Sequence, residues 1–177
     1  MSKIITITAG HSNVDPGAVN GQHREADIAQ EARNVVAYYL KQKGIEILTD
    51  GEGKGNLPLS KAIGLIKGSA IAVEFHCNAS ANKSAKGVEA LAQSKDKTIS
   101  QQLCKAVADV MGIPVRGDHR GWKPENSGQH TRLGYVANGG IILELFFISN
   151  DQELAISHQK KWLACKAIAD VLAQAAL

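Results

Sequence analysis

Residues 141–147 read IILELFF, an apolar, β-rich run that is interrupted only by Glu144. Residues 70–76 read AIAVEFH and have the same character, with Glu74 and His76 as the polar exceptions. Short apolar runs of this kind are typical of strands buried inside a sheet. Both segments are therefore predicted to be strands, and each brings ionisable side chains into an apolar setting.

Strand and helix patterns alternate around these two segments. Further β-rich runs predict strands at 4–8, 45–49 and 87–92. Helical patterns predict helices at 25–43, 59–67, 99–111 and from about Asn150 to the C-terminus, where Asn150 and Glu153 match a capping box. Segment 112–140 is irregular, with only a hint of a strand at 134–137. This alternation predicts a single α/β domain over residues 1–177 with a largely parallel sheet.

Composition agrees with a folded globular protein. The 177 residues are 44% hydrophobic and 21% charged, which is not the composition of an intrinsically disordered chain. No run of about 18 apolar residues is present, so no transmembrane helix is predicted. A formal charge of +3 is too small to indicate nucleic-acid binding. Cys77, Cys104 and Cys165 form no C-x-x-C pair, and reduced core thiols are predicted.

Ligand sites in parallel sheets lie at the carboxyl ends of the strands, and this rule selects candidate residues here. His11 follows the first predicted strand, His76 ends the third, and Glu144 lies within the strand 141–147. Glu25 stands at the start of the first long helix. Two histidines and one carboxylate suit a catalytic zinc site with an open position for water, and a further glutamate can serve as general base and acid.

Each candidate also has an ordinary structural explanation. His11 is compatible with a plain loop histidine, His76 with a hydrogen-bonded core histidine, and Glu25 with a first-turn glutamate that favours a helix N-terminus. Glu144 is harder to explain in this way, because a carboxylate inside an apolar strand is costly to bury unless it is paired, hydrogen-bonded or protonated. Glu74 shares the strand face of His76 and is a candidate for support of that ring.

Two neighbouring residues are weaker ligand candidates. His23 lies two residues before Glu25 and competes with it for the place of third ligand. Cys77 should point to the opposite face from His76, since successive strand residues alternate. A packed thiol is the better explanation of Cys77, and the site then stays open instead of being closed by a fourth protein ligand.

Three blocks of sequence carry recognisable motifs. Segment 8–29, TAGHSNVDPGAVNGQHREADIA, contains a glycine–histidine pair, then D-P-G-A, then a glutamate that heads a helix. Segment 70–80, AIAVEFHCNAS, is a strand that ends in histidine, a small residue and asparagine. Segment 141–150, IILELFFISN, is a glutamate-containing strand that ends in F-I-S-N. With GVEAL at 87–91, these blocks resemble the zinc-dependent N-acetylmuramoyl-L-alanine amidases of the amidase type 3 family.

The resemblance implies a fold and a role for individual residues. The fold is a twisted, mostly parallel sheet with helices on both faces. The zinc ligands fall on His11, Glu25 and His76, and the catalytic glutamate falls on Glu144. Asn78 matches an asparagine that helps to shape the site, and we expect it to contact substrate.

The chain departs from the family pattern in three places. Ser12 stands where a second glycine is common, and Thr49-Asp50 stands where an arginine followed by an acidic residue is common. Segment 112–140 has no close counterpart.

Segment 112–140 contains three arginines that suit bidentate contacts with the carboxylates of a peptide substrate, namely Arg116, Arg120 and Arg132. Arg132 is the preferred substrate-binding candidate, because it lies closest in sequence to the strand 141–147. Solvated arginines are the alternative.

The resemblance implies a peptidoglycan hydrolase that cleaves the amide between the lactyl group of N-acetylmuramic acid and L-alanine. Zn²⁺ is then the cofactor and peptidoglycan the partner. Two other functions stay open: a zinc peptidase that cuts within the stem peptide, and a non-catalytic module that binds wall fragments. We expect a monomer that neither binds nucleic acid nor inserts into a membrane.

The N-terminal sequence MSKIITITAGH lacks the apolar core of a secretory signal. We therefore expect cytoplasmic synthesis without a signal peptide. Action on the cell wall would then follow a breach of the inner membrane, as for a phage endolysin. A bacterial recycling amidase is the alternative.

Overall fold

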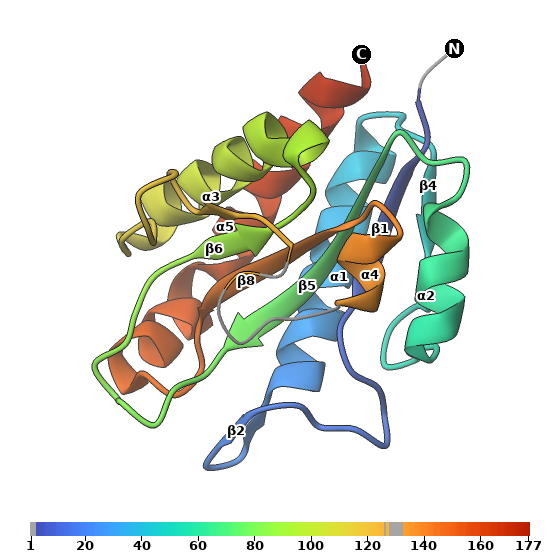
Figure 1. The fold of residues 1–177 in the computed structure, drawn as a ribbon. Helices are drawn as coiled ribbons and strands as arrows, with labels where there is room; N and C mark the ends of the chain where they lie inside the picture. The colour runs from blue at the N-terminus through green and yellow to red at the C-terminus, as the bar shows by residue number, and fades with distance from the viewer. Residues whose placement is uncertain (1–2, 126, 128–132) are drawn as a thin grey trace.

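The computed structural model describes residues 3–125, 127 and 133–177. The strands are β1 (Ile5–Ala9), β2 (Val19–Asn20), β3 (His23–Arg24), β4 (Ile47–Thr49), β5 (Ile71–Asn78), β6 (Glu89–Leu91), β7 (Trp122–Lys123) and β8 (Ile141–Phe147). The helices are α1 (Glu25–Gln42), α2 (Leu59–Ile66), α3 (Lys97–Met111), α4 (Gly134–Ala137) and α5 (Asp151–Ala176), with a 3-10 turn η1 (Ser94–Asp96). Figure 1 shows their arrangement.

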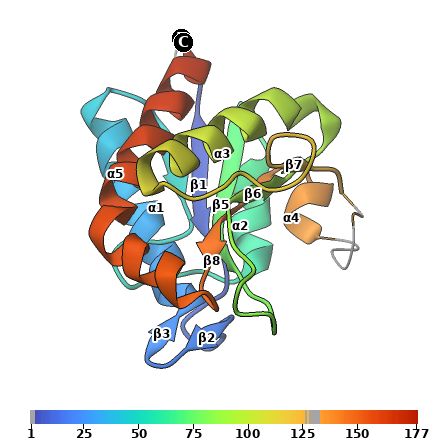
Figure 2. The same ribbon diagram turned by 90° about the vertical axis from the view of Figure 1, so that its left-hand side faces the viewer.

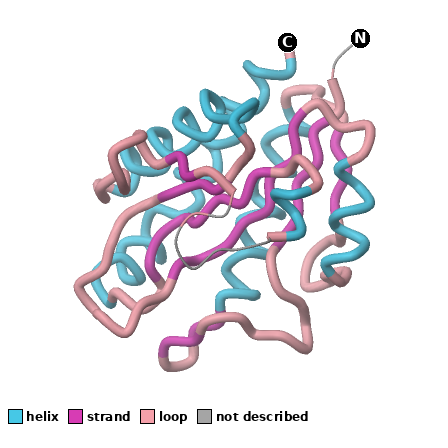
Figure 3. The backbone as a smooth tube through the Cα atoms, in the orientation of Figure 1, coloured by secondary structure: helices cyan, strands magenta, loops and turns pink. Residues whose placement is uncertain are grey.

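The main sheet has six strands in the order β4-β1-β5-β8-β6-β7. The first four of these run parallel, β6 is antiparallel to β8, and β7 is parallel to β6. This confirms the predicted α/β fold with a mostly parallel sheet. Long loops follow the carboxyl ends of β1 and β5, as Figure 3 shows.

Helices cover both faces of the sheet, but unequally (Figure 2). The long helices α1, α3 and α5 pack on one face, against apolar residues such as Ile7, Phe75 and Leu143. The shorter α2 and α4 lie on the other face, where Ala72 and Ile142 belong to a second, smaller core cluster. The second face is therefore left partly open near the strand ends.

Alternation along the strands gives the two faces different chemistry. Residues next to the main-core residues Ile7, Phe75, Ala90 and Leu143 along each strand point to the opposite face, toward α2 and α4. Several of these residues are polar, namely Thr6, Thr8, Glu74, His76, Glu89 and Glu144. Cys77 lies in the main core on the face opposite His76, and all three cysteines are free and buried, as predicted.

The segment 134–137 corrects one expectation. It forms the one-turn helix α4 and not a strand. Tyr135 and Val136 are buried against Ala62 and Ile66 of α2, so packing on the second face overrides the weak local preference for a strand.

The start of α5 confirms half of the predicted capping box. The Asn150 side chain accepts hydrogen bonds from the backbone N–H groups of Gln152 and Glu153. The Glu153 carboxylate accepts instead from the N–H groups of Gly87 and Phe147, at 2.7 and 2.8 Å. Glu153 therefore ties α5 to the ends of two strands and does not close the box.

A buried ion pair anchors the loop that follows β4. Arg33 of α1 and Asp50 are both fully buried, with 3.1 Å between Nη1 and Oδ1. Asp50 also accepts from the N–H of Ala9. Thr49 stands at the position where the family resemblance leads one to expect an arginine, and the arginine that pairs with Asp50 is instead Arg33 of α1. The pair thereby fixes the end of β1, from which the first candidate ligand projects.

Among the described residues, no helix combines the length and the apolar character needed to cross a bilayer.

Candidate metal centre and active site

Three elements bring His11, Glu25 and His76 together. His11 follows β1, Glu25 is the first residue of α1, and His76 lies near the carboxyl end of β5. The Glu25 carboxylate bridges the two rings, with Oε2 3.0 Å from His11 Nε2 and Oε1 3.0 Å from His76 Nδ1. One donor atom from each residue lies within 4.8 Å of the others, as a shared metal ion requires. The structure thus assembles the three predicted ligands.

The backbone around this cluster is shaped for close approach. A Cβ on Gly10 would lie 2.2 Å from His76 Cε1, and a Cβ on Gly17 would lie 2.6 Å from Glu25 Oε2. His11 itself has a left-handed φ of 64°, and Asn56 Nδ2 donates to its carbonyl at 2.8 Å. Only glycine fits at positions 10 and 17 without displacing a candidate ligand.

Each histidine has a second carboxylate behind it. His11 Nδ1 lies 2.9 Å from Asp15 Oδ2, and His76 Nε2 lies 3.0 Å from Glu74 Oε1. The backbone at Asp15 is held in turn by Ser12, which stands where the resembled family commonly has glycine. The Ser12 Oγ accepts a hydrogen bond from the N–H of Asp15 at 3.2 Å. Metal-bound histidines commonly use their other ring nitrogen in this way, which fixes the tautomer and the ring orientation.

The charges in the cluster support one another. Burial alone would raise the pKa of Glu25, but hydrogen bonds with His11 and His76 hold that pKa well below its usual range. The Glu25 hydrogen bond raises the pKa of His11. Burial would lower the pKa of His76, yet contacts with Glu25 and Glu74 raise it well above 6.5. Carboxylates that favour a positive charge at this point also favour a divalent cation there.

Glu144 lies beside this cluster in the centre of β8. It stands opposite His76 of β5 in the parallel register and is only 7% exposed. Its Oε2 is buried and has no hydrogen-bond partner among the described residues. Burial is the main cause that raises the pKa of Glu144 to about 7. A carboxylate with a pKa near neutrality is suited to accept and return a proton.

The remaining predicted site residues fall elsewhere. Asn78 lies outside the metal cluster, where its Nδ2 donates to Glu89 Oε1 at 2.6 Å. His23 packs its ring on His158, with 4.6 Å between centroids, and does not belong to the cluster found among the described residues. Arg132 lies outside the described residues. Its role as a substrate-binding residue stays a prediction.

Glu89 is a residue that the sequence reasoning missed. It is 1% exposed and stands opposite Glu144 in the antiparallel register of β6 and β8. Its carboxylate contacts Arg116 and Lys123 at 2.8 and 2.7 Å. The signal was available, because an acidic residue inside GVEAL is the same anomaly that singled out Glu144.

The fold and the site together define an α/β protein with a candidate metal centre of hydrolase type, built from a His–Glu–His set and a separate buried glutamate. The chain belongs to the N-acetylmuramoyl-L-alanine amidase family, because the Amidase_3 family model matches residues 5–174. This membership places the protein among the amidases.

Solved structures agree with this assignment. A Neisseria meningitidis protein considered to be an N-acetylmuramoyl-L-alanine amidase is 55% identical, with a TM-score of 0.90 over 98% of this chain and 95% of that one. The catalytic domain of CwlV, an amidase of Bacillus (Paenibacillus) polymyxa, is 23% identical, with a TM-score of 0.79 over 98% and 97% of the chains.

The catalytic domain of the CD27L endolysin, which targets Clostridia difficile, is 20% identical, with a TM-score of 0.67 over 97% and 95% of the chains. At the identities of CwlV and CD27L, the likeness shows a shared fold. A comparison with curated protein sequences gave no significant match.

Proposed function

We propose that this protein is a zinc-dependent amidase that cleaves the bond between the lactyl group of N-acetylmuramic acid and L-alanine in peptidoglycan. One observation carries the proposal. The carboxylate of Glu144 is buried, and its Oε2 lacks a hydrogen-bond partner among the described residues, directly across from His76. A buried acid without a partner is costly to keep, and it is explained by a proton-transfer role beside the His11, Glu25 and His76 cluster.

The donor set fits zinc. Two imidazole nitrogens and one carboxylate oxygen make a three-ligand set that leaves a coordination position open, as in catalytic zinc sites. A zinc ion held by His11, Glu25 and His76 would supply Lewis-acid polarisation of the scissile carbonyl and would lower the pKa of water to roughly 7. Asp15 and Glu74 hold the two rings in the orientation that this role needs.

Proton transfer falls to Glu144. Its carboxylate accepts a proton from the attacking water and returns it to the amine nitrogen of the leaving L-alanine. A pKa of about 7 suits both halves of this task, since the group is readily deprotonated and readily reprotonated near neutral pH. Removal of such a group from a catalytic set is expected to lower the rate by several orders of magnitude.

The test uses purified peptidoglycan with three samples: the native protein, the protein treated with a chelator, and the Glu144→Gln variant. Zinc content is measured on the same samples. We expect the native protein to release material, chelation to stop release, and Glu144→Gln to retain zinc while losing activity. If Glu144→Gln remains active, the proposed mechanism is wrong.

Product analysis separates the alternatives. The amidase releases intact stem peptides that begin with L-alanine. A zinc peptidase acting within the stem releases shorter fragments, and a non-catalytic wall-binding module releases nothing while sedimenting with the wall. Either of these last two results would replace the proposed function.

A comparison of two substrates tests the biological role of the protein. An endolysin role predicts strong activity on intact sacculi, whereas a recycling amidase should prefer soluble muropeptides. The likeness to the CD27L domain is a likeness of fold and does not choose between them. A rate comparison on both substrates distinguishes the two roles, and light scattering tests the predicted monomer.

A further inference from the structure

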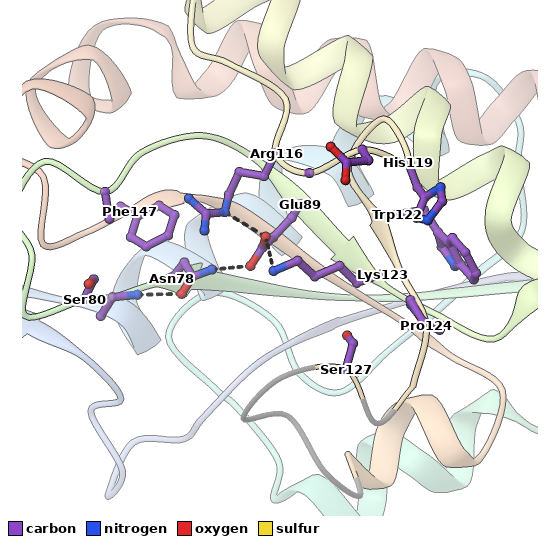
Figure 4. Close-up of a pocket in the computed structure, with 14 residues that line it drawn as sticks. Asn78, Ser80, Glu89, Arg116, His119, Trp122, Lys123, Pro124, Ser127 and Phe147 are labelled. Atoms are coloured by element: carbon purple, nitrogen blue, oxygen red, sulfur yellow. Dashed lines mark hydrogen bonds and ion pairs between the residues drawn. The ribbon is translucent and has the colours of Figure 1, made fainter.

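A hollow opens next to the candidate active site, on the same face of the sheet. It has a volume of about 490 Å³ and takes its walls from β5, β6, β7 and the segments that flank β7. Figure 4 shows Asn78, Glu89, Arg116, Lys123 and Phe147 around it. We refer to it as the Glu89 pocket.

Strand register places this pocket beside the reacting groups. His76, Glu144 and Glu89 stand opposite one another on the adjacent strands β5, β8 and β6. The Glu89 pocket therefore lies one strand beyond Glu144, on the side away from His76. Neighbouring strands are about 4.8 Å apart, and an extended peptide advances about 3.4 Å per residue. A group one or two residues from the bond at Glu144 can reach the pocket.

The floor of the pocket is a buried carboxylate that holds two cations. Glu89 Oε2 accepts from Arg116 Nε at 2.8 Å and lies 2.7 Å from Lys123 Nζ. Glu89 Oε1 accepts from Asn78 Nδ2 at 2.6 Å. Burial would raise the pKa of Glu89, but Lys123 and Arg116 hold it below its usual value, so this group carries one negative charge against two positive ones.

Arg116 is held rigidly while remaining accessible. Its guanidinium carbon lies 4.6 Å from the centroid of the Phe147 ring, and Nη1 donates to the Lys86 carbonyl at 2.9 Å. The side chains of Arg116 and Lys123 are 32% and 33% exposed. A cation fixed in place before binding loses little conformational entropy when an anion arrives.

One acidic residue stands at the margin. Asp118 also lines the pocket, but it is exposed, and it forms no ion pair among the described residues. Its charge is screened by solvent, whereas Glu89 is buried and its two cationic partners are only about one-third exposed. The floor therefore sets the preference of the pocket for an anion.

We propose that the Glu89 pocket is a carboxylate-binding subsite, in which Arg116 and Lys123 hold a free carboxylate of the peptide one or two residues from the scissile amide. The inference rests on the proposed function, because it takes the peptide arm of peptidoglycan as the substrate. Glu89 and Asn78 are positioning residues that keep the two cations in place. Among the three arginines of segment 112–140, Arg116 is the one that the described geometry favours.

Binding tests the subsite without any need for turnover. The probes are two stem tripeptides that begin with L-alanine and differ only at the second residue, whose carboxylate is free in one and amidated in the other. Titration calorimetry on the zinc-loaded Glu144→Gln protein should show at least tenfold tighter binding of the free carboxylate. Adding Lys123→Gln or Arg116→Gln should reduce this ratio to about two or less.

Arg120→Gln is the matched control, since Arg120 is an exposed arginine of the same segment that does not line the Glu89 pocket. It should retain the full ratio. If Arg116→Gln does not fold, Lys123→Gln decides the question alone. A ratio near one in the parent protein, no binding of either peptide, or a full ratio in Lys123→Gln would overturn the subsite.

The two proposals fail separately. Hydrolysis of peptidoglycan with a ratio near one leaves the amidase function standing without this subsite. A high ratio that depends on Lys123, in a protein that hydrolyses no peptidoglycan, leaves the subsite standing and rejects the proposed reaction. In active protein, Lys123→Gln should raise KM for the free-carboxylate substrate while kcat stays within about twofold.

Discussion

Glu74 lies behind His76 on the same face of β5, with its Oε1 3.0 Å from Nε2 of the imidazole. Glu74 is almost fully buried, and its other oxygen accepts from Thr8 Oγ1 at 3.3 Å. His76 thus has Nδ1 directed toward Glu25 and Nε2 directed toward Glu74. The ring orientation that metal binding needs is therefore set by a carboxylate two residues away on the same strand.

Replacement of this carboxylate should weaken metal binding. We expect Glu74→Gln to fold and to bind zinc about 10- to 100-fold more weakly, because a neutral amide supports the ring less well than a carboxylate. Competition with a chromophoric chelator measures the affinity. Asp15→Asn is the companion variant, and its effect should be smaller, since the Asp15 side chain is 61% exposed. Unchanged affinity in Glu74→Gln would remove Glu74 from this role.

Glu144 should make the metal-free protein less stable as pH rises. Its pKa is about 7 in the folded protein against an ordinary value of 4.5. Between these values the folded state binds more protons than the unfolded state, so the free energy of unfolding falls as pH rises through this window. Below it, both states are protonated and the penalty vanishes. Above pH 7 the penalty reaches about 3 kcal/mol, at about 1.4 kcal/mol per pKa unit.

The Glu144→Gln variant tests this relation. With a chelator present, urea unfolding should show the variant to be more stable than the native protein by about 3 kcal/mol at pH 8 and nearly equal to it at pH 4.5. The same substitution that stabilises the protein would then abolish its activity. An equal difference at both pH values would show that the effect is one of packing and not of charge.

Gly17 should be required for the geometry of the metal centre. Its φ is +63°, and a Cβ there would lie 2.6 Å from Glu25 Oε2. Gly21 is a matched control, since its φ is +61° and a Cβ there meets nothing within 4 Å. Both alanine variants carry the same backbone strain of about 1–2 kcal/mol. Only Gly17→Ala should also lose zinc affinity, and equal affinities in the two variants would contradict the steric argument.

The buried pair of Arg33 and Asp50 should be essential for stability. Arg33→Met leaves the Asp50 carboxylate buried without its partner, which is expected to lower the free energy of unfolding by about 3–5 kcal/mol. The double variant Arg33→Met/Asp50→Asn should recover part of this loss, because no uncompensated charge remains. Chemical denaturation measures both, and a double variant less stable than Arg33→Met would argue against the charge effect.

Local sequence signals predicted much of the candidate site. Apolar runs identify β5 and β8, and a carboxylate inside such a run is anomalous wherever the strand finally lies, so Glu144 stands out from sequence alone. Glu25 was not distinguishable by this reasoning from an ordinary first-turn glutamate. The family resemblance selected it, and the structure shows it bridging His11 and His76.

The sequence by itself determined the α/β class, the order of the longer elements and the polar residues at the strand ends, because hydrophobic periodicity and strand alternation are local properties of the chain. Tertiary structure decided the helical state of Gly134–Ala137, the burial of Arg33 against Asp50, and the pairing of Glu89 with Arg116 and Lys123. These features depend on which distant segments meet across the sheet. Burial and partnership set their energies, and both exist only in the folded protein.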